Sequence, residues 1–389
     1  MKGGFRSLNE ILSFRGGGTP RKDVPEYWSD EIPWASVKDF KSLDLAKTQD
    51  SISRKGLEAS ASNLIPAGHV IIPTRMALGK AAINSIDMAI NQDLRALIPK
   101  VPLDSRYLLH AMIGLADEIV RYGSGATVKG ITQENLGKLQ IPLPPLAEQK
   151  RIAAILDAAD ALRAKRSEAL AQLDALLQST FLTLFGDPVT NPMGWPMAAM
   201  GSQLKVIGGY AFKSDDFQER GLPVIRISNL NKDSIDLDGC ARIPKAKIGK
   251  GEKFRIIAGD TLIAMSGATT GKLGLVPDDL NDEWYLNQRV GAFRIPGNSR
   301  IHREYLRALL ASPFYQRHVL NLAGGAAQPN ISGAQLESAK TPLPPLPLQQ
   351  KFAAIVESIE RQKTTQRTHL TELDALFAAL QHRAFRGEL

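Results

Sequence analysis

Two glycine-punctuated stretches of this chain carry side chains that can contact nucleic acid. Arginine can bond guanine through two hydrogen bonds, asparagine and glutamine can bond adenine, and lysine, serine and threonine can hold phosphates. A purely structural interpretation stays open for each stretch, because an asparagine beside a strand often caps a turn. The candidate DNA-contacting residues are Thr74, Arg75, Lys80, Asn91, Gln92 and Arg95 in the first stretch, and Ser266, Thr269, Thr270, Lys272, Asn287, Gln288 and Arg289 in the second.

Two further turns form a second candidate surface. The turn 124–129 ends at Lys129, and the turn 328–332 contains Gln328 and Asn330. Side chains of these types can contact DNA. The turns are equally well explained as the entries of the helices that follow them.

No pattern in the chain predicts a catalytic or metal-binding residue. Gly267–Lys272 is one residue too short for a phosphate-binding P-loop and is followed by Leu273, where that motif needs Ser or Thr. Gly16–Gly18 lacks the strand-to-helix context of a dinucleotide-binding turn. The six histidines are scattered, with no pair at metal-ligand spacing. We therefore expect no catalytic residue, no metal and no cofactor in this chain.

The elements that must position these loops are repeated along the chain. The sequence Leu-Pro-Pro-Leu occupies 143–146 and recurs 200 positions later at 343–346. The same offset relates Leu-Asp-Ala-Leu at 173–176 to its copy at 373–376, whereas the Asn-Gln pairs of the candidate loops lie 196 apart. Insertions and deletions therefore fall in the globular parts, while the helices keep their length. The chain is predicted to be a duplicated module.

Each Leu-Pro-Pro-Leu sequence is predicted to open a long amphipathic helix, since proline is tolerated only in a helix's first turn. Apolar positions then recur in alternating steps of three and four, the 3.5-residue period of a coiled-coil seam. Each helix should run roughly 38 residues, or about 57 Å. The two are expected to pair antiparallel as a spacer, because neither can bury its own apolar stripe. The predicted seam consists of Ile152, Ile155, Leu162, Leu173 and Leu176 in the first helix, and Phe352, Ile355, Ile359, Leu373 and Leu376 in the second.

The predicted fold class is α+β, with two mixed α/β globular domains joined by two long antiparallel coiled-coil helices in a pseudo-twofold internal repeat. Short β-branched segments bounded by Gly or Pro, such as Val70–Pro73 and Gly259–Ala264, predict strands. One helix is expected in each domain, over Arg106–Arg121 and Arg303–Leu320. The predicted boundaries are 1–140 for the first globular domain, 141–190 for the central helical spacer and linker, 191–340 for the second globular domain, and 341–389 for the distal helical spacer.

Composition is compatible with a nucleic-acid partner. The 389 residues are 43% apolar and 23% charged, and they suffice for two to three folded domains. The net charge of +8 lies in the globular blocks, with +3 in 1–140 and +5 in 191–340. A basic surplus suits a polyanion. Cys240 is the only cysteine, and neither a signal peptide nor a run of ~18 apolar residues is present, so a cytoplasmic protein without a membrane partner is expected.

At the level of motifs, the chain resembles the specificity subunit of type I restriction–modification systems. The resemblance covers essentially the whole length. It is carried most specifically by the two helix openings at 141–150 and 341–350, by the helix exit at 184–188 and by the ending at 384–387. One departure is Pro347-Leu348 in the second opening, where the first has Ala147-Glu148. The two helix starts therefore need not bind a partner equally.

The resemblance implies two target recognition domains, each reading one half of a split double-stranded DNA sequence, separated by a paired-helix spacer. It implies that two methyltransferase (M) subunits dock on the helices and that restriction/motor (R) subunits join them. AdoMet, ATP and Mg²⁺ would belong to those partner subunits. The recognition loops vary within the family, so the resemblance does not identify the residues that contact bases.

Three alternatives remain from the sequence. An orphan DNA-binding scaffold would have the same sequence features, and only co-purifying chains would distinguish it. A duplicated enzyme is opposed by the lack of a repeated catalytic set. A coiled-coil interaction protein that does not bind DNA is opposed weakly by the basic globular blocks.

Overall fold

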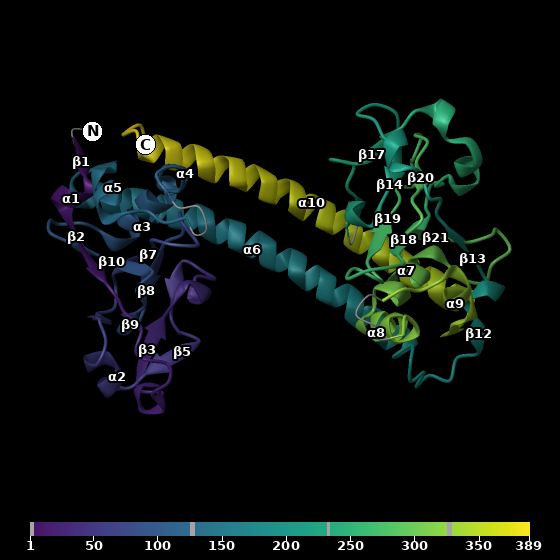
Figure 1. The fold of residues 1–389 in the computed structure, drawn as a ribbon, viewed down its shortest axis with the longest axis horizontal. Coiled ribbons are helices and arrows are strands. Elements are labelled where there is room, and N and C mark those ends of the chain that lie inside the picture. Colours follow the sequence, from purple (N-terminus) through teal and green to yellow (C-terminus); the bar gives the residue numbers. More distant parts are fainter. Residues whose placement is uncertain (1–3, 125–128, 232–233, 325–328) are drawn as a thin grey trace. The chain divides into compact units, whose positions relative to one another are not determined.

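The computed structural model of the chain describes residues 4–124, 129–231, 234–324 and 329–389. It divides into two compact units, each built from one globular part and one end of each long helix. The first unit comprises Met1–Glu168 with Arg367–Leu389, and the second comprises Ala169–Gln366 (Figure 1). The helical segments predicted as spacers are thus shared between the two units.

The globular part of the first unit contains two sheets. A five-stranded sheet has the order β2-β10-β7-β8-β4, a four-stranded sheet has the order β5-β3-β9-β6, and β1 pairs with β11. All four residues of β7 are buried, as in a strand covered on both faces. The elements are β1 Phe5–Ser7, α1 Leu8–Ile11, β2 Leu12–Gly16, β3 Ile32–Ala35, β4 Asp44–Leu45, β5 Asp50–Ile52, α2 Arg54–Glu58, β6 Leu64–Ile65, β7 Val70–Pro73, β8 Ala82–Asn84, β9 Met88–Ile90, β10 Leu94–Pro99, α3 Ser105–Gly114, α4 Ala116–Arg121, α5 Gln133–Lys138, β11 Gln140–Pro142 and α6 Leu146–Phe185.

The second unit repeats this plan with one strand fewer in each of the two sheets. Its sheets have the orders β13-β21-β18-β19 and β17-β14-β20, and β12 pairs with β22 as β1 does with β11. The middle strand of the second sheet, β14, pairs antiparallel with β17 and parallel with β20. The elements are β12 Met197–Ala199, β13 Lys205–Gly208, β14 Leu222–Ile225, β15 Leu230–Asn231, β16 Ser234–Ile235, β17 Ala241–Ile243, β18 Thr261–Ala264, β19 Leu273–Leu275, β20 Tyr285–Leu286, β21 Val290–Arg294, α7 Arg303–Ala311, α8 Pro313–Leu322, α9 Gly333–Ser338, β22 Lys340–Pro342 and α10 Leu346–Ala384.

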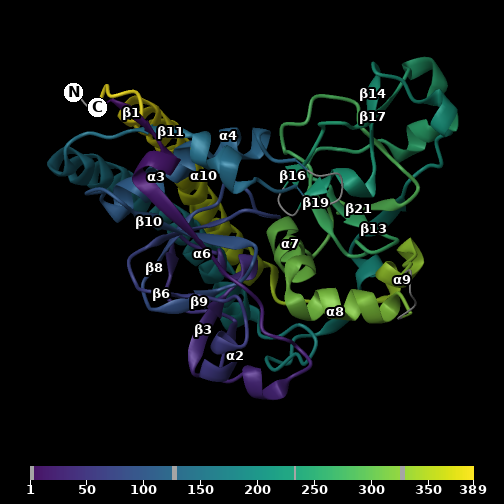
Figure 2. The same cartoon turned by 60° about the vertical axis from the view of Figure 1, so that its left-hand side comes forward.

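The single helix predicted in each globular part was wrong, because each is broken into two. In the second unit the break falls at Ser312, which is extended and caps α8 by accepting a hydrogen bond from the backbone N–H of Tyr315. Pro313 then occupies the first turn, where its missing N–H costs nothing. In the first unit α3 ends at Gly114 and α4 starts after Leu115. The bend between α7 and α8 is visible in Figure 2.

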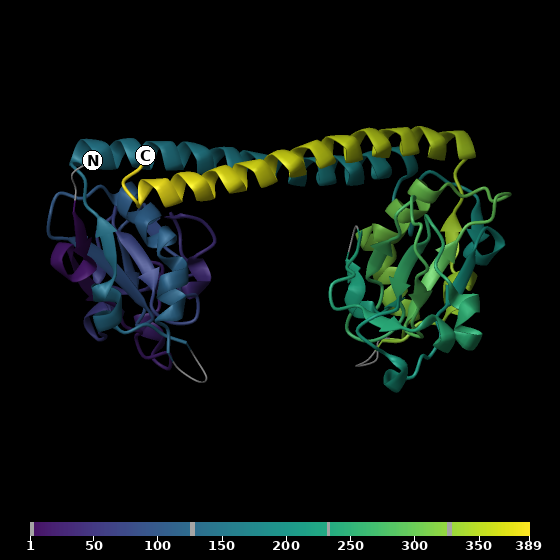
Figure 3. The same ribbon diagram turned by 90° about the horizontal axis from the view of Figure 1, so that it is seen from above.

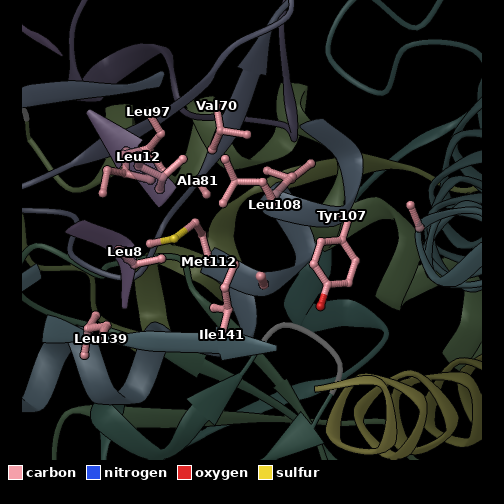
Figure 4. Packing of buried hydrophobic residues seen from close by; sticks show 14 of the residues in the cluster. Leu8, Leu12, Val70, Ala81, Leu97, Tyr107, Leu108, Met112, Leu139 and Ile141 are labelled. Atoms are coloured by element: carbon pink, nitrogen blue, oxygen red, sulfur yellow. The ribbon is translucent and has the colours of Figure 1, made fainter. Parts of the chain in front are cut away.

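The ends of the long helices are part of each unit's hydrophobic core. In the first unit Ile152 and Leu156 of α6 and Phe377 of α10 belong to the same buried cluster as Tyr107 and Leu108 of α3. Figure 4 shows Tyr107 and Leu108 with other members of this cluster. In the second unit, the ring of Phe185 of α6 packs on Tyr305 of α7 and on Phe352 of α10, with ring centroids 4.8 Å and 5.4 Å apart. Each globular part therefore packs against both long helices.

A buried glutamine fastens the start of each long helix. The Gln149 amide donates to the carbonyl of Pro144 (2.9 Å) and its oxygen accepts from the backbone N–H of Asp104 (2.8 Å). Gln349, 200 positions later, donates to Pro344 (2.8 Å) and accepts from His302 (2.8 Å). Both side chains are essentially inaccessible to solvent. This repeated contact explains why the two proline-rich openings share their glutamine.

Within each unit, α6 and α10 pair antiparallel, as predicted (Figure 3). The residues that face inward follow the predicted 3.5-residue period, but the steps run four then three. In α6 they include Ile152, Leu156 and Ala159, and in α10 Phe352, Val356, Ile359 and Lys363.

Part of the predicted seam was therefore wrong. Leu162, Leu176 and Leu376 are 47%, 51% and 49% exposed, and Ile155 and Ile355 are only half-buried. Most of these misassigned residues are followed directly by a second apolar residue, as Leu376 is by Phe377. The 3.5-residue period fits either member of such a pair, so it cannot show which one lies in the seam. Ile152, Phe352 and Ile359 are buried as predicted, while Leu173 and Leu373 are half-buried.

The observed seam contains one cation in each unit, Arg163 and Lys363. Because these positions are not apolar, the sequence pattern did not assign them to the seam. Arg163 bonds Asp160 (2.9 Å) and, across the helix pair, Asp374 (2.6 Å). The equivalent Lys363 bonds Glu360 (2.7 Å) and Asp174 (2.9 Å). Burial by itself would lower the pKa of Lys363, but its bonds to Glu360 and Asp174 outweigh burial and raise that pKa. The seam cation is thus held in its charged form.

Candidate nucleic-acid interface

Three chain segments meet at one place in each unit, and the predicted contact residues lie there. In the first unit the backbone of Thr74 donates to Asp93 (2.7 Å) and accepts from Ile131 (2.9 Å). In the second unit Met265 donates to Arg289 and accepts from Ile331, both at 2.9 Å. We name these junctions the first corner (residues 74–76, 91–93 and 129–131) and the second corner (265–267, 287–289 and 329–331).

The first corner presents an arginine held beside a carboxylate. Arg75 is 64% exposed, and its guanidinium lies 3.8 Å from the Asp93 carboxylate, which is 11% exposed. The exposed Lys129 adjoins it, because the Lys129 carbonyl accepts the backbone N–H of Met76 (3.3 Å). Cations of both segments therefore share one surface, although the sequence presented them as separate candidate sites.

The second corner is a hollow of about 430 Å³. Its polar lining includes Ser266, Gln288, Arg289 and Asn330, which come from all three segments. Gln288, Arg289 and Asn330 are exposed. The hydroxyl of Ser266 is buried and finds no hydrogen-bond partner within the described part of the chain. The hollow thus offers both donors and acceptors to a ligand.

The backbone bonds also align the two corners residue by residue. Thr74 corresponds to Met265, so Arg75 takes the place of Ser266, and Asp93 takes the place of Arg289. The arginine thus comes from different segments in the two units. In the sequence, Asn91-Gln92 aligns with Asn287-Gln288, and the residues that follow these pairs are Asp93 and Arg289. The exchange of acid for arginine was therefore visible there, but Asp93 was not identified as the partner of Arg75.

Four of the predicted contact residues are corrected by their burial. Thr74, Asn91, Thr270 and Asn287 are each at most 9% exposed. The Thr74 hydroxyl donates to Asp93, the Asn91 side chain accepts from the Asp93 backbone, and the Thr270 hydroxyl donates to Gly267 and Pro329. The bonds of Thr74, Asn91 and Thr270 lie within the corners, and all four side chains have little exposed surface to offer a base.

The other candidate residues differ in whether their side chains are already hydrogen-bonded within the protein. The Arg95 guanidinium donates to the carbonyls of Gln92 (2.9 Å) and Leu94 (2.8 Å), and the Gln92 side chain accepts from Thr19. Lys80 donates to the carbonyl of Phe40 (3.1 Å). Thr269 and Lys272 are exposed on the turn beside the second corner. Gln328 lies outside the described residues.

No catalytic constellation accompanies these corners within the described ranges. Over these ranges, no group of three or more His, Cys, Asp or Glu side chains is placed to hold a metal ion. No helix that is described is long and apolar enough to cross a bilayer. The chemistry that the corners offer is recognition, through charge and hydrogen bonding.

Comparison with known proteins gives a consistent family. A family model described as "Type I restriction modification DNA specificity domain" matches residues 4–172 and 192–375. The MjaIX specificity subunit of Methanocaldococcus jannaschii is 22% identical over 99% of this chain and 93% of its own length. The EcoR124I/EcoR124II specificity subunit of Escherichia coli is 32% identical over 46% of each chain.

Solved structures give the same fold. The S subunit of the type I restriction–modification system of M. genitalium superposes with a TM-score of 0.59 at 14% identity, over 98% of this chain and 96% of its own. A second structure, which concerns complex assembly and conformational transition of the type I R-M system, superposes with a TM-score of 0.60 at 18% identity, over 100% and 99%.

Proposed function

The chain belongs to the family of type I restriction–modification DNA specificity proteins, and we propose that its two units each read one half of a split DNA sequence. One observation carries this proposal for the chain itself. The same three-segment corner occurs in both units, with different exposed side chains at equivalent positions. A duplicated scaffold with two different reading surfaces suits a target with two different halves.

The exposed side chains in and beside the corners have defined roles in the proposal. Arg75 and Arg289 contact guanine or a phosphate, Gln288 and Asn330 contact base edges, and Lys129 and Lys272 contact phosphates. Asp93 acts as a positioning residue, because its carboxylate restrains the Arg75 guanidinium.

The proposal assigns the catalytic work to partner chains. Two methyltransferase subunits dock on the paired helices, and restriction/motor subunits join that complex. AdoMet, ATP and Mg²⁺ then belong to these partners, and the assembly works in the cytoplasm, where its DNA is. The specificity-subunit names of the relatives support this division of labour.

Methylome sequencing of a host with and without this chain tests the proposal. We expect methylation at one bipartite motif that disappears when the chain is deleted and the methyltransferase gene is intact. Unchanged methylation would contradict it. The purified chain alone should transfer no methyl group, and turnover free of contaminating methyltransferase would favour a duplicated enzyme instead.

A further inference from the structure

The positive charge of the second unit is concentrated in one short segment. Residues 242–255 contain six cationic side chains and a single carboxylate, Glu252. The block 191–340 carries a net +5, and this segment accounts for all of it, because the remaining 13 cations are matched by 13 acids. The net positive charge of the block 191–340 therefore comes from residues 242–255 alone.

The segment is anchored by the side chains that point inward. Ile243 and Ile248 are buried, and the ring of Phe254 stacks on that of Tyr210 with centroids 5.6 Å apart. Glu252 accepts a hydrogen bond of 2.8 Å from the Tyr285 hydroxyl. Burial, followed by this bond, raises the pKa of Tyr285 to about 12, so the phenol remains a donor. The one carboxylate of the segment is exposed, and this hydrogen bond holds one of its oxygens.

The exposed cations of the segment are four lysines and Arg255, which lies 3.9 Å from Glu283. Lys245 lies 3.1 Å from Glu283, and Lys247 lies 3.1 Å from Asp216, so each is balanced by an acid. Lys250 and Lys253 are exposed, and over the described ranges they form no ion pair. Two adjacent cations are therefore available to an anionic partner.

This segment lies next to the second corner. Arg255 forms a β-bridge with Tyr285, the first residue of β20. β20 is followed at once by Asn287, the first residue of this part of the second corner. Asn287 also forms a β-bridge with Tyr210, the residue on which Phe254 stacks. At about 3.3 Å per residue, the corner begins within roughly 7 Å of that bridge between Arg255 and Tyr285.

The first unit lacks this charge at the matching place. Its equivalent of β17 and the turns that follow, Asp50–Glu58, carries two cations and two acids. One of those cations, Lys55, lies 3.7 Å from Glu26. The segment is therefore specific to the second unit and is not a general feature of the duplicated scaffold.

We propose that Lys250 and Lys253 form a phosphate-binding surface that holds the DNA backbone beside the bases contacted by the second corner. The proposal rests on the proposed function. It makes the second unit the main source of sequence-independent, salt-sensitive affinity, while the hollow of the second corner supplies discrimination. Duplex DNA is favoured over an acidic protein partner because the segment that carries the lysines adjoins the second corner.

The double substitution Lys250→Gln and Lys253→Gln tests this, in the full chain assembled with its methyltransferase subunits. Binding to a duplex of random sequence is measured between about 50 and 200 mM salt. Each lost phosphate contact lowers the slope of log K against log salt by about 0.9, so the slope should fall by roughly two. The matched control, Arg54→Gln with Lys55→Gln, removes two cations from the equivalent segment and should leave the slope unchanged.

The remaining outcomes overturn the proposal in distinguishable ways. An unchanged slope, or an equal fall in both double variants, would exclude a phosphate site at Lys250 and Lys253 while leaving the proposed function intact. Loss of the methyltransferase subunits during purification would assign the surface to a protein partner. If the unsubstituted complex itself shows no sequence preference, the proposed function fails instead.

Discussion

Single residues decide how the two corners differ. The position occupied by the acid Asp93 in the first unit is occupied by the cation Arg289 in the second. The first unit takes its arginine from the neighbouring segment, at Arg75, where the second unit has Ser266. Opposite charges at matched positions cannot favour the same base pattern. The two halves of the target are therefore expected to differ.

Substitution of Arg289 by Ala should weaken discrimination in one half of the target only. A bidentate contact to guanine accounts for about 1–3 kcal/mol of discrimination, or roughly 5- to 150-fold. The measurement is the methylation rate on targets with single base changes. Arg300→Ala is the control, because Arg300 is also exposed but its carbonyl faces the start of α10 at Gln349. A uniform loss on all sequences would make Arg289 a phosphate contact.

Among the elements, the long helices depend on how their first turns are fixed. Gln349 satisfies three backbone groups inside the second unit, at Pro344, Arg300 and His302. An unsatisfied buried polar group costs about 1–3 kcal/mol.

The Gln349→Leu substitution should therefore lower the free energy of unfolding of the second unit by at least about 1–3 kcal/mol. The neighbouring Gln350→Leu is the control, since Gln350 is exposed and such changes usually stay within about 0.5 kcal/mol. Urea unfolding of both variants provides the comparison. Equal stability of the two would mean that the proline-rich openings are retained for another reason.

The phase of the helix seam can be tested with two adjacent residues of α10. Phe377 is 8% exposed and its ring lies 4.6 Å from the Arg163 guanidinium, whereas Leu376 is 49% exposed. Phe377→Ala should cost about 3–5 kcal/mol of stability in the first unit. Leu376→Ala should change stability by less than about 0.5 kcal/mol. Thermal unfolding of both variants checks this. A larger loss of stability in Leu376→Ala than in Phe377→Ala would support the seam predicted from the sequence.

At the scale of the whole molecule, duplication predicts that the reading surfaces are exchangeable. Replacing residues 191–340 by the block of a relative should change one half of the methylated motif and leave the other half intact. The donor block must keep an aromatic residue at Tyr305, whose ring packs on Phe181 and Phe185 of α6. Methylome sequencing gives the result. A change in both halves would mean that the blocks read DNA jointly.

The helices are proposed to set the number of unread base pairs between the two halves. Inserting one heptad after Glu168 in α6 and one after Gln366 in α10 keeps the four-three seam in phase. Each helix should lengthen by about 10.5 Å, which corresponds to roughly three base pairs. The variant should methylate the same two halves with a longer spacer. An active variant with the original spacer would assign the spacing to the partner subunits.

The amino-acid sequence determined the repeat, the two long helices, their antiparallel pairing and the α+β class. These properties follow from periodicity, proline placement and the 200-residue offset, all of which are local or internal to the chain. The same information located the loops that form the corners, because Gly-rich turns and their polar residues are visible in one dimension.

Only the tertiary structure decided which residues of those loops are available. Thr74 and Thr270 are chemically suited to DNA, yet backbone carbonyls of distant segments accept hydrogen bonds from their hydroxyls. The Asn91 side chain is likewise occupied, by the backbone N–H of Asp93. The sequence also could not show which residues form the seam. Lys363 is tolerated inside the helix pair only because it forms ion pairs with Glu360 and Asp174. Hydrogen bonds and ion pairs between residues far apart in the chain determine burial, and a sequence period does not contain them.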